Sequence, residues 1–342
     1  MNGQKTANRR TLLASALCGA VLTSWGQPAL AQNQFPSKTM SFVVPYPAGG
    51  ANDMLGRLIG QKMAEALNGT AMVDNKPGAA AMLGASAVAR APADGHTLLI
   101  GGLATHAASP NMLKADYDPL KDFESVGMIG SAPIIAITFN ESPFKSLKDV
   151  VDAARKDPKG VMYGSSGNGS PLHLAGELFN QSTGTSITHI PYRGSAPALQ
   201  DVMASQADFV FDPGIAFPHI KAGKVKLLAV VSEKRSPFFP DVPTVGEQGF
   251  KGANLDIWFG MWTPNNTPSD VVTRLNREIA KALAKTGGAI AIAGDLAITT
   301  NLSAGTVTLG AGDQIASTRT ATIGTGGTLD LATFTTSPIS MN

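Results

Sequence analysis

The stretch Pro45-Tyr46-Pro47-Ala48-Gly49-Gly50-Ala51-Asn52-Asp53 follows a short run typical of a buried β-strand, residues 40–44. It leads into residues 54–67, where apolar side chains recur at close to helical spacing. A strand, a glycine-rich turn and a helix start place several free backbone N–H groups at one point, where the helix dipole also favours negative charge. The stretch therefore predicts a turn that binds an anion.

A second stretch has the same organisation. Gly164-Ser165-Ser166-Gly167-Asn168-Gly169-Ser170 joins the strand-like residues 161–163 to a helical run at residues 172–181. Two such units in one chain indicate an anion held between two lobes, because each unit gathers free N–H groups at a helix start.

Strand-like and helix-like runs alternate along most of the chain, which is typical of parallel βαβ units. We predict an α/β fold with two lobes, a mostly parallel sheet in each lobe and a cleft between them. The predicted division is lobe 1 at residues 32–130 and 254–285 and lobe 2 at residues 131–253. A ligand is expected in the cleft, outside the carboxyl ends of the strands.

The N-terminus has the three parts of a secretory signal peptide. Lys5, Arg9 and Arg10 form a basic region, residues 12–22 are apolar, and Ala29-Leu30-Ala31 is a small-residue cleavage site. We expect export to the periplasm with cleavage after Ala31. The adjacent arginines leave the twin-arginine route open beside the general secretory one.

Charge and cysteine content limit the class of partner. Removing the three basic residues of the signal from the 27 in the chain leaves 24 Lys and Arg against 25 Asp and Glu, so nothing favours nucleic acid or a membrane surface. The single cysteine, Cys18, lies in the signal, and the five histidines show no metal-ligand spacing. We expect no cofactor and no metal, and we expect a monomer.

The last 57 residues, 286–342, differ in composition from the rest. They contain no Lys, and their one Arg is Arg319, while Thr, Ser, Gly and Ala dominate. Short alternating runs such as residues 289–292 suggest β-structure, with disorder as the alternative. We interpret the change as a fusion, frameshift or recombination junction near Lys285, and the alternative is an ordinary Gly/Thr-rich tail.

Several motifs of the chain together resemble those of a known family. Over residues 35–284 the chain is similar to the extracytoplasmic receptors of tripartite tricarboxylate transporters, the Bug-type periplasmic binding proteins. The matching motifs are both glycine-rich stretches, Asn75-Lys76-Pro77-Gly78-Ala79, Ala93-Asp94-Gly95, Thr105-His106, residues 117–123, residues 191–198 and Pro240-Asp241-Val242-Pro243-Thr244. The resemblance implies a two-lobed receptor that closes about a hinge and delivers small carboxylates to membrane subunits of a transporter. It also implies a charged helical C-terminus, which residues 286–342 do not supply.

The predicted ligand contacts lie mainly on the two turns. In the first turn they are Tyr46, Ala48, Gly49, Gly50, Asn52 and Asp53, with helix capping as the alternative role of Asn52 or Asp53. In the second turn they are Ser165, Ser166, Gly167, Gly169 and Ser170, whose hydroxyl and N–H groups can donate to a carboxylate.

Other candidates lie on neighbouring strand ends. Thr105, His106, Tyr192 and Gly194 are expected on loops that face the same cleft, and Asp212 is expected to order the cleft or the hinge. For Arg193, pairing with a carboxylate and exposure to solvent are both open, and for His173 packing or capping is favoured over ligand contact.

Taken together, the residues favour a periplasmic receptor that captures a small organic carboxylate by closing its cleft. The alternatives are a sensor that presents the ligand to a signalling receptor, a periplasmic hydrolase, and a non-functional chimera caused by the replaced C-terminus. The second glycine-rich stretch does not fit the G-x-S-x-G, P-loop or G-x-G-x-x-G patterns, so we do not expect an enzyme.

Overall fold

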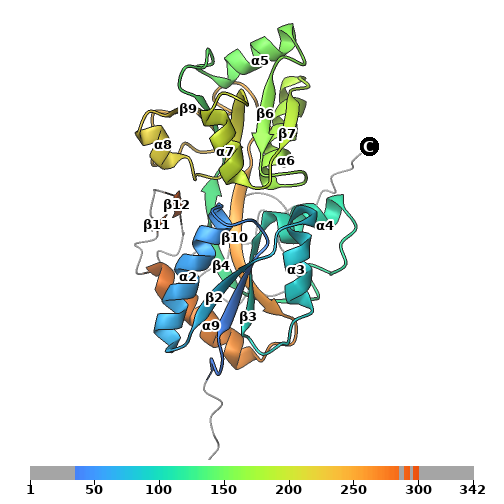
Figure 1. Cartoon of the computed structure of the whole chain (residues 1–342), viewed down its shortest axis with the longest axis vertical. Coiled ribbons are helices and arrows are strands. Elements are labelled where there is room, and N and C mark those ends of the chain that lie inside the picture. Colours follow the sequence, from blue (N-terminus) through green and yellow to red (C-terminus); the bar gives the residue numbers. More distant parts are fainter. Residues whose placement is uncertain (1–34, 285–288, 293–295, 300–342) are drawn as a thin grey trace, which may run out of the picture.

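The computed structural model describes residues 35–284, 289–292 and 296–299. The expected export signal and most of the tail lie outside these residues. Two lobes follow one another along the long axis of the molecule, and each is built on its own sheet (Figure 1).

The first sheet has seven strands in the order β11-β12-β4-β10-β3-β1-β2. Helices cover both of its faces, and their buried side chains form separate apolar clusters with alternate residues of the strands. The elements of this lobe are β1 (Met40–Val44), α2 (Ala51–Leu67), β2 (Ala71–Asn75), the short helix η1 (Ala79–Ala81), α3 (Met82–Ala89), β3 (Thr97–Gly102), the π-helical turn η2 (Ala104–Ala108), α4 (Ser109–Met112), β4 (Phe123–Pro133), β10 (Asp256–Pro264), α9 (Ser269–Ala284), β11 (Ala289–Ile292) and β12 (Leu296–Thr299).

The second sheet has five strands in the order β7-β6-β8-β5-β9. Here too, helices pack on both faces, α5 and α6 on one and α7 and α8 on the other. The elements are β5 (Ile135–Phe139), α5 (Leu147–Lys156), β6 (Met162–Ser165), α6 (Pro171–Thr183), β7 (Thr188–Pro191), α7 (Ser195–Met203), β8 (Phe209–Asp212), α8 (Phe217–Lys221) and β9 (Val225–Val230).

Both sheets are mixed, whereas the sequence predicted mostly parallel ones. Strand β1 runs parallel to β2 and β3, and β6 runs parallel to β7 and β8, as βαβ units require. Strands β10 and β5 pair antiparallel with their neighbours. The difference arises where the chain passes between the lobes, because β5 and β10 each enter a lobe directly from the other one and do not follow a crossover helix.

Local sequence explains where the helices next to the cleft begin and end. Helix α2 buries Leu55, Ile59 and Met63 on one face, and Asn68 ends it in the left-handed conformation, with φ of 52°. Helix α6 begins at Pro171, and the Ser170 hydroxyl before it accepts a hydrogen bond from the His173 N–H group.

The chain passes between the sheets at two adjacent places. Ile134 separates β4 from β5, and residues 231–255 connect β9 to β10. The Val231 N–H group donates to the Ile134 carbonyl (2.7 Å), and the Leu255 N–H group donates to the Val231 carbonyl (2.7 Å). The crossings are therefore joined by backbone hydrogen bonds, and the Ser232 hydroxyl adds a short hydrogen bond to Asp256.

Two further observations concern the predicted elements. Strand β4 was not predicted, whereas residues 289–292 form β-structure as their alternation suggested, and β12 reaches the sheet through the pair Thr299 and Ser131.

Across the described part of the chain, no helix has the length and apolar character that crossing a membrane requires.

Candidate functional site

One cavity lies between the lobes at the point where three helices begin. The first turns of α2, from lobe 1, and of α6 and α7, from lobe 2, all contribute to its wall. The first N–H groups of a helix have no partner within it, and the helix dipole places partial positive charge there. The lining residues are Tyr46, Pro47, Ala48, Gly50, Ala51, Asn52, Gly102, Leu103, Ala104, Ser166, Pro171, Leu172, Arg193, Gly194, Ser195, Ala196, Pro197, Pro213, Ile257, Trp258 and Phe259.

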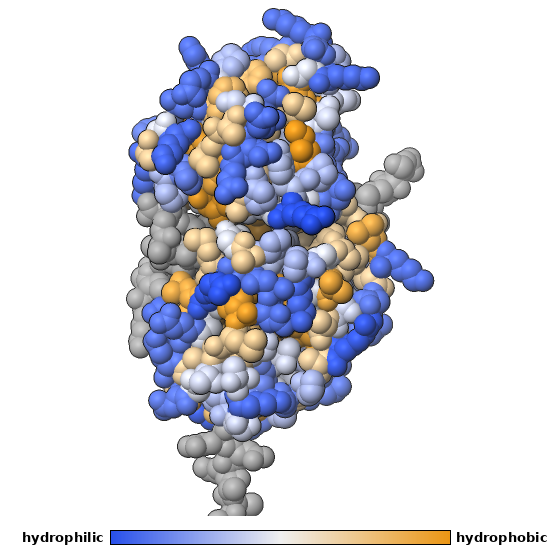
Figure 2. Space-filling model, in the orientation of Figure 1, coloured by the Kyte–Doolittle hydropathy of each residue, from blue (hydrophilic) through white to orange (hydrophobic). Residues whose placement is uncertain are grey.

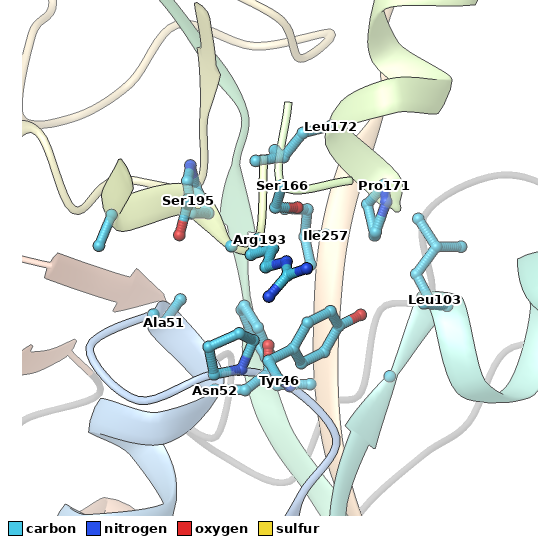
Figure 3. Close-up of a pocket in the computed structure, with 18 of the residues that line it drawn as sticks. Tyr46, Ala51, Asn52, Leu103, Ser166, Pro171, Leu172, Arg193, Ser195 and Ile257 are labelled. Atoms are coloured by element: carbon cyan, nitrogen blue, oxygen red, sulfur yellow. The ribbon is translucent and has the colours of Figure 1, made fainter. Parts of the chain in front are cut away.

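The close-up shows how these groups face one another. Tyr46 and Asn52 approach from lobe 1, Ser166 and Ser195 from lobe 2, and Ile257 lies behind them on β10 (Figure 3). In the space-filling view, polar and charged side chains cover the outer ends of both lobes, while many apolar ones border the line between the lobes (Figure 2). The cavity thus combines helix N-termini, which in general favour negative charge, with an apolar wall.

The first turn is held in shape by Asp53, which is 3% exposed. Its carboxylate accepts hydrogen bonds from the Gly49 N–H group (2.9 Å), Arg57 Nε (3.0 Å) and Asn75 Nδ2 (2.9 Å). Gly49 has a φ of +85°, which favours glycine. Burial favours the neutral form of Asp53, but these hydrogen bonds outweigh burial and hold its pKa below the usual value. Asp53 and Gly49 therefore shape the turn and do not line the cavity.

The residue that caps helix α2 is neither Asn52 nor Asp53, the two candidates for capping in the sequence prediction. The N-cap of α2 is Gly50. Asp53 instead reaches back from the third helical position to Gly49, much as the acid of a capping box does. Asn52 lines the cavity, and its Nδ2 group donates to the Ile100 carbonyl (3.2 Å).

In the second turn, two predicted donors are already used within lobe 2. The Gly167 N–H group donates to Ser165 Oγ (3.1 Å), and the Gly169 N–H group donates to His173 Nδ1 (3.1 Å). Ser170 caps α6. Of the residues predicted in this turn, Ser166 lines the cavity, and the others hold the turn in place.

A cluster of aromatic side chains supports this turn from behind. His189 Nε2 lies 2.6 Å from Ser165 Oγ, and its ring stacks on His173 with centroids 4.0 Å apart. The Tyr163 hydroxyl donates to Glu177 (2.7 Å), and the Tyr163 ring stacks on His189. Burial lowers the pKa of His189 to about 4, with the neighbouring His173 as a smaller cause. Burial also lowers the pKa of His173, which packs against His189 as expected.

Thr105 and His106 lie behind the lobe 1 wall of the cavity. The Thr105 hydroxyl accepts a hydrogen bond from the Gly102 N–H group (3.0 Å) and lies 2.8 Å from His106 Nδ1. His106 stacks on Trp262 at 3.8 Å, and burial lowers its pKa to about 3. These side chains support the wall formed by Gly102 and its neighbours and are not among the lining residues.

Tyr192 and Asp212 also have internal partners. The Tyr192 ring packs on Gly164, and burial, with a hydrogen bond to Asp201, raises the Tyr192 pKa to about 12. Asp212 is buried at the end of β8, where it accepts hydrogen bonds from the Gly214 (2.7 Å) and Ala216 (3.0 Å) N–H groups. Burial raises its pKa to about 7 against these bonds. Asp212 thereby orders the loop that carries the lining residue Pro213.

The structure thus separates the predicted residues into two sets. Those that line the cavity are Tyr46, Ala48, Gly50, Asn52, Ser166 and Gly194, and those that lie outside its lining are Gly49, Asp53, Thr105, His106, Ser165, Gly167, Gly169, Ser170, Tyr192 and Asp212. The common reason is that short polar side chains on tight turns find partners within their own turn or the adjacent strand.

The sequence prediction placed Gly194 on a loop that faces the cleft, but it did not name Ser195 or Ala196 after it, and it missed most of the apolar wall. Gly194, with φ of +109°, is the N-cap of α7, so that Ser195 and Ala196 begin the helix at the cavity. A glycine directly before a helical run is a usable signal for such a start. The wall residues of β10, from Ile257 to Phe259, gave no comparable signal because an apolar strand resembles ordinary core.

Comparison with known proteins adds a family and close structural relatives. A family model described as "Tripartite tricarboxylate transporter family receptor" matches residues 55–294. A protein of Pseudomonas sp. (strain P51), the "UPF0065 protein in tcbD-tcbE intergenic region", is 35% identical over 278 residues, which are 81% of this chain and 82% of that protein. Protein BugT of Bordetella pertussis is 32% identical over 273 residues, 78% of this chain and 83% of BugT.

Two solved structures from Rhodopseudomonas palustris are similar in both sequence and fold. Rpa4515 with adipate is 37% identical with a TM-score of 0.69, over 72% of this chain and 83% of that one. MatC with bound malate is 34% identical with a TM-score of 0.69, over 73% of this chain and 85% of that one. These matches confirm the two-lobed binding-protein fold predicted from the sequence.

Proposed function

The chain belongs to the tripartite tricarboxylate transporter receptor family, a family of binding proteins and not of enzymes, and from this premise we propose that it captures a small organic carboxylate in the cleft between its lobes. Adipate and malate, the ligands named for the two similar structures, are both carboxylates. Export to the periplasm by residues 1–31 remains a prediction and agrees with this role.

The observation that carries the proposal is the meeting of three helix starts at one cavity. A carboxylate placed there accepts hydrogen bonds from first-turn N–H groups of α2 and α7, and all three helix dipoles favour its charge. Helix α6 offers the Leu172 N–H group, because Pro171 has no N–H and the His173 N–H group donates to Ser170. Gly50 and Gly194 allow the backbone to approach the ligand, and Asn52, Ser166 and Ser195 add polar side chains. Tyr46 and Ala48 complete the lobe 1 side.

The remaining predicted residues act by shaping these turns. Asp53 fixes the Gly49 N–H group, Ser165 fixes Gly167, and His173 fixes Gly169. Turns that are held before the ligand arrives lose little conformational freedom on binding, which favours affinity.

We propose cleft closure as the mechanism of capture. The lobes already approach closely at the cavity, because a Cβ atom added at Gly50 would lie 3.6 Å from Ser195 Oγ, and one added at Gly194 would lie 3.4 Å from Pro47. The two adjacent crossings, at Ile134 and at residues 231–255, provide the hinge. The closed, loaded form then delivers the ligand to membrane subunits of a tripartite transporter.

The experiment compares two glycine substitutions in carboxylate binding. Gly50 and Gly246 both lack a positive φ and both leave room for a Cβ atom, but only Gly50 faces the opposite lobe. Gly50→Val should remove binding, because its methyl groups extend toward Ser195 and obstruct the N–H groups, whereas Gly246→Val should bind like the unmodified protein.

Binding is measured by thermal shift and calorimetry against a panel of mono-, di- and tricarboxylates. A ligand that binds only the folded state stabilises it by about 2.7 kcal/mol at a hundredfold excess over its Kd. No shift with any carboxylate, in a protein that unfolds cooperatively, would contradict the proposal. Equal affinity in Gly50→Val and Gly246→Val would contradict the placement of the ligand.

A further inference from the structure

Arg193 is the charged residue of the cavity lining. Among the described residues that line the cavity, the others are apolar, small or neutral and polar. Its guanidinium extends from the turn before α7 into the space between Ser166 of lobe 2 and Tyr46 of lobe 1 (Figure 3). The cavity therefore carries one full positive charge in addition to the partial charges of its helix ends.

The Arg193 guanidinium has no acceptor in the described part of the chain. Other arginines on the surface do have one, such as Arg57 with Asp53, Arg90 with Asp116, and Arg235 with Glu247. An arginine that lines a cavity and is not paired leaves its planar set of donors available for a carboxylate, which it binds in bidentate fashion.

Arg193 lies closer to solvent than the helix starts do. Gly194 and Ser195, directly after it, are buried, whereas Arg193 itself is exposed. The backbone donors thus lie deep in the cavity, and the guanidinium lies at its solvent side. Apolar side chains, among them Leu103, Leu172 and Ile257, line the same cavity. This arrangement fits a ligand with an anionic group at each end and an apolar body.

We propose that Arg193 binds a second carboxylate and makes the receptor selective for dicarboxylates. The assignment rests on the proposed function, since the first carboxylate occupies the helix starts. A ligand with a single carboxylate binds there without using Arg193, so the charge of Arg193 acts on selectivity and not on capture of the first carboxylate.

The test measures Kd by calorimetry for straight-chain dicarboxylates from succinate to suberate and for the monomethyl ester of each. The ester keeps the length of the ligand and removes one charge. The unmodified protein should bind its best diacid about tenfold to a hundredfold more tightly than the matching ester, as a charge-assisted bidentate contact does. In Arg193→Gln this preference should disappear, with the affinity for the ester unchanged.

Lys159→Gln is the matched control, because it removes one positive charge from the exposed α5–β6 connection of the same lobe. Its preference for the diacid should equal that of the unmodified protein. Equal binding of diacid and ester by the unmodified protein would overturn the assignment. So would an Arg193→Gln variant that loses diacid and ester equally, because Arg193 would then serve the first carboxylate. If no carboxylate binds the unmodified protein, the proposed function itself fails.

Discussion

The hydrogen bonds of Asp53 allow a worked prediction for Asp53→Asn. An asparagine has the same size, but only one of its two polar atoms accepts hydrogen bonds. It can satisfy either Asn75 or the pair Gly49 and Arg57, and its NH₂ group then faces a donor on the other side. Losing a charge-assisted bond costs about 1.5–3 kcal/mol, and an unsatisfied buried donor adds about 1–3 kcal/mol. We therefore expect the free energy of unfolding to fall by about 3–5 kcal/mol.

Urea unfolding near neutral pH measures this loss, with Asp152→Asn as the control. Asp152 forms an exposed ion pair with Lys148, so its substitution should cost less than about 1 kcal/mol. Because the folded-state pKa of Asp53 is lowered, its contribution is present above the pKa of the unfolded chain and is lost as the pH falls through the folded pKa. The two variants should thus converge in strong acid. An Asp53→Asn variant as stable as Asp152→Asn near pH 7 would refute the reasoning.

Three other predictions concern stability. Burial raises the pKa of Asp212 to about 7, so its contribution to stability is greatest below the unfolded pKa of about 3.9 and is lost as the pH rises to about 7. Over this pH range, the free energy of unfolding of Asp212→Asn should not show the decrease that Asp212 causes in the unmodified protein. A Cβ atom at Gly102 would lie 2.0 Å from the Trp258 carbonyl, so Gly102→Ala should lower the melting temperature and alter tryptophan fluorescence, whereas Gly246→Ala should do neither. Ser146→Ala removes the capping box of α5 and should cost about 1 kcal/mol in urea unfolding; an unchanged midpoint would show that the cap contributes nothing.

The sequence was most informative where local chemistry decides the structure. Strand, turn and helix around Gly49 and around Gly167 lie within a few residues of the predicted bounds, because glycine turns and helical periodicity act over short distances. Strand β4 was missed because its buried residues do not alternate, which follows from its bulged pairing with β10.

The site was harder to predict because hydrogen-bond partners come from distant parts of the chain. Nothing near Ser165 in the sequence shows that His189, 24 residues away, takes its hydroxyl. Asp53 similarly finds Asn75 at a distance of 22 residues. Sequence patterns therefore identified the turns that carry the site, but could not say which of their polar groups remain free for a ligand.

At three places beside the cavity, small residues of the two lobes face one another. Gly49 faces Ala196, Gly50 faces Ser195, and Gly169 faces Ala80. Such pairs bury little apolar surface, so these contacts contribute little to a closed state. Under the proposed mechanism, most of the energy that holds the lobes together then comes from the ligand. If the cleft closes as proposed, the shape of the protein would report whether the cleft is occupied, and a membrane partner that recognises only the closed shape would be protected from competition by the empty receptor.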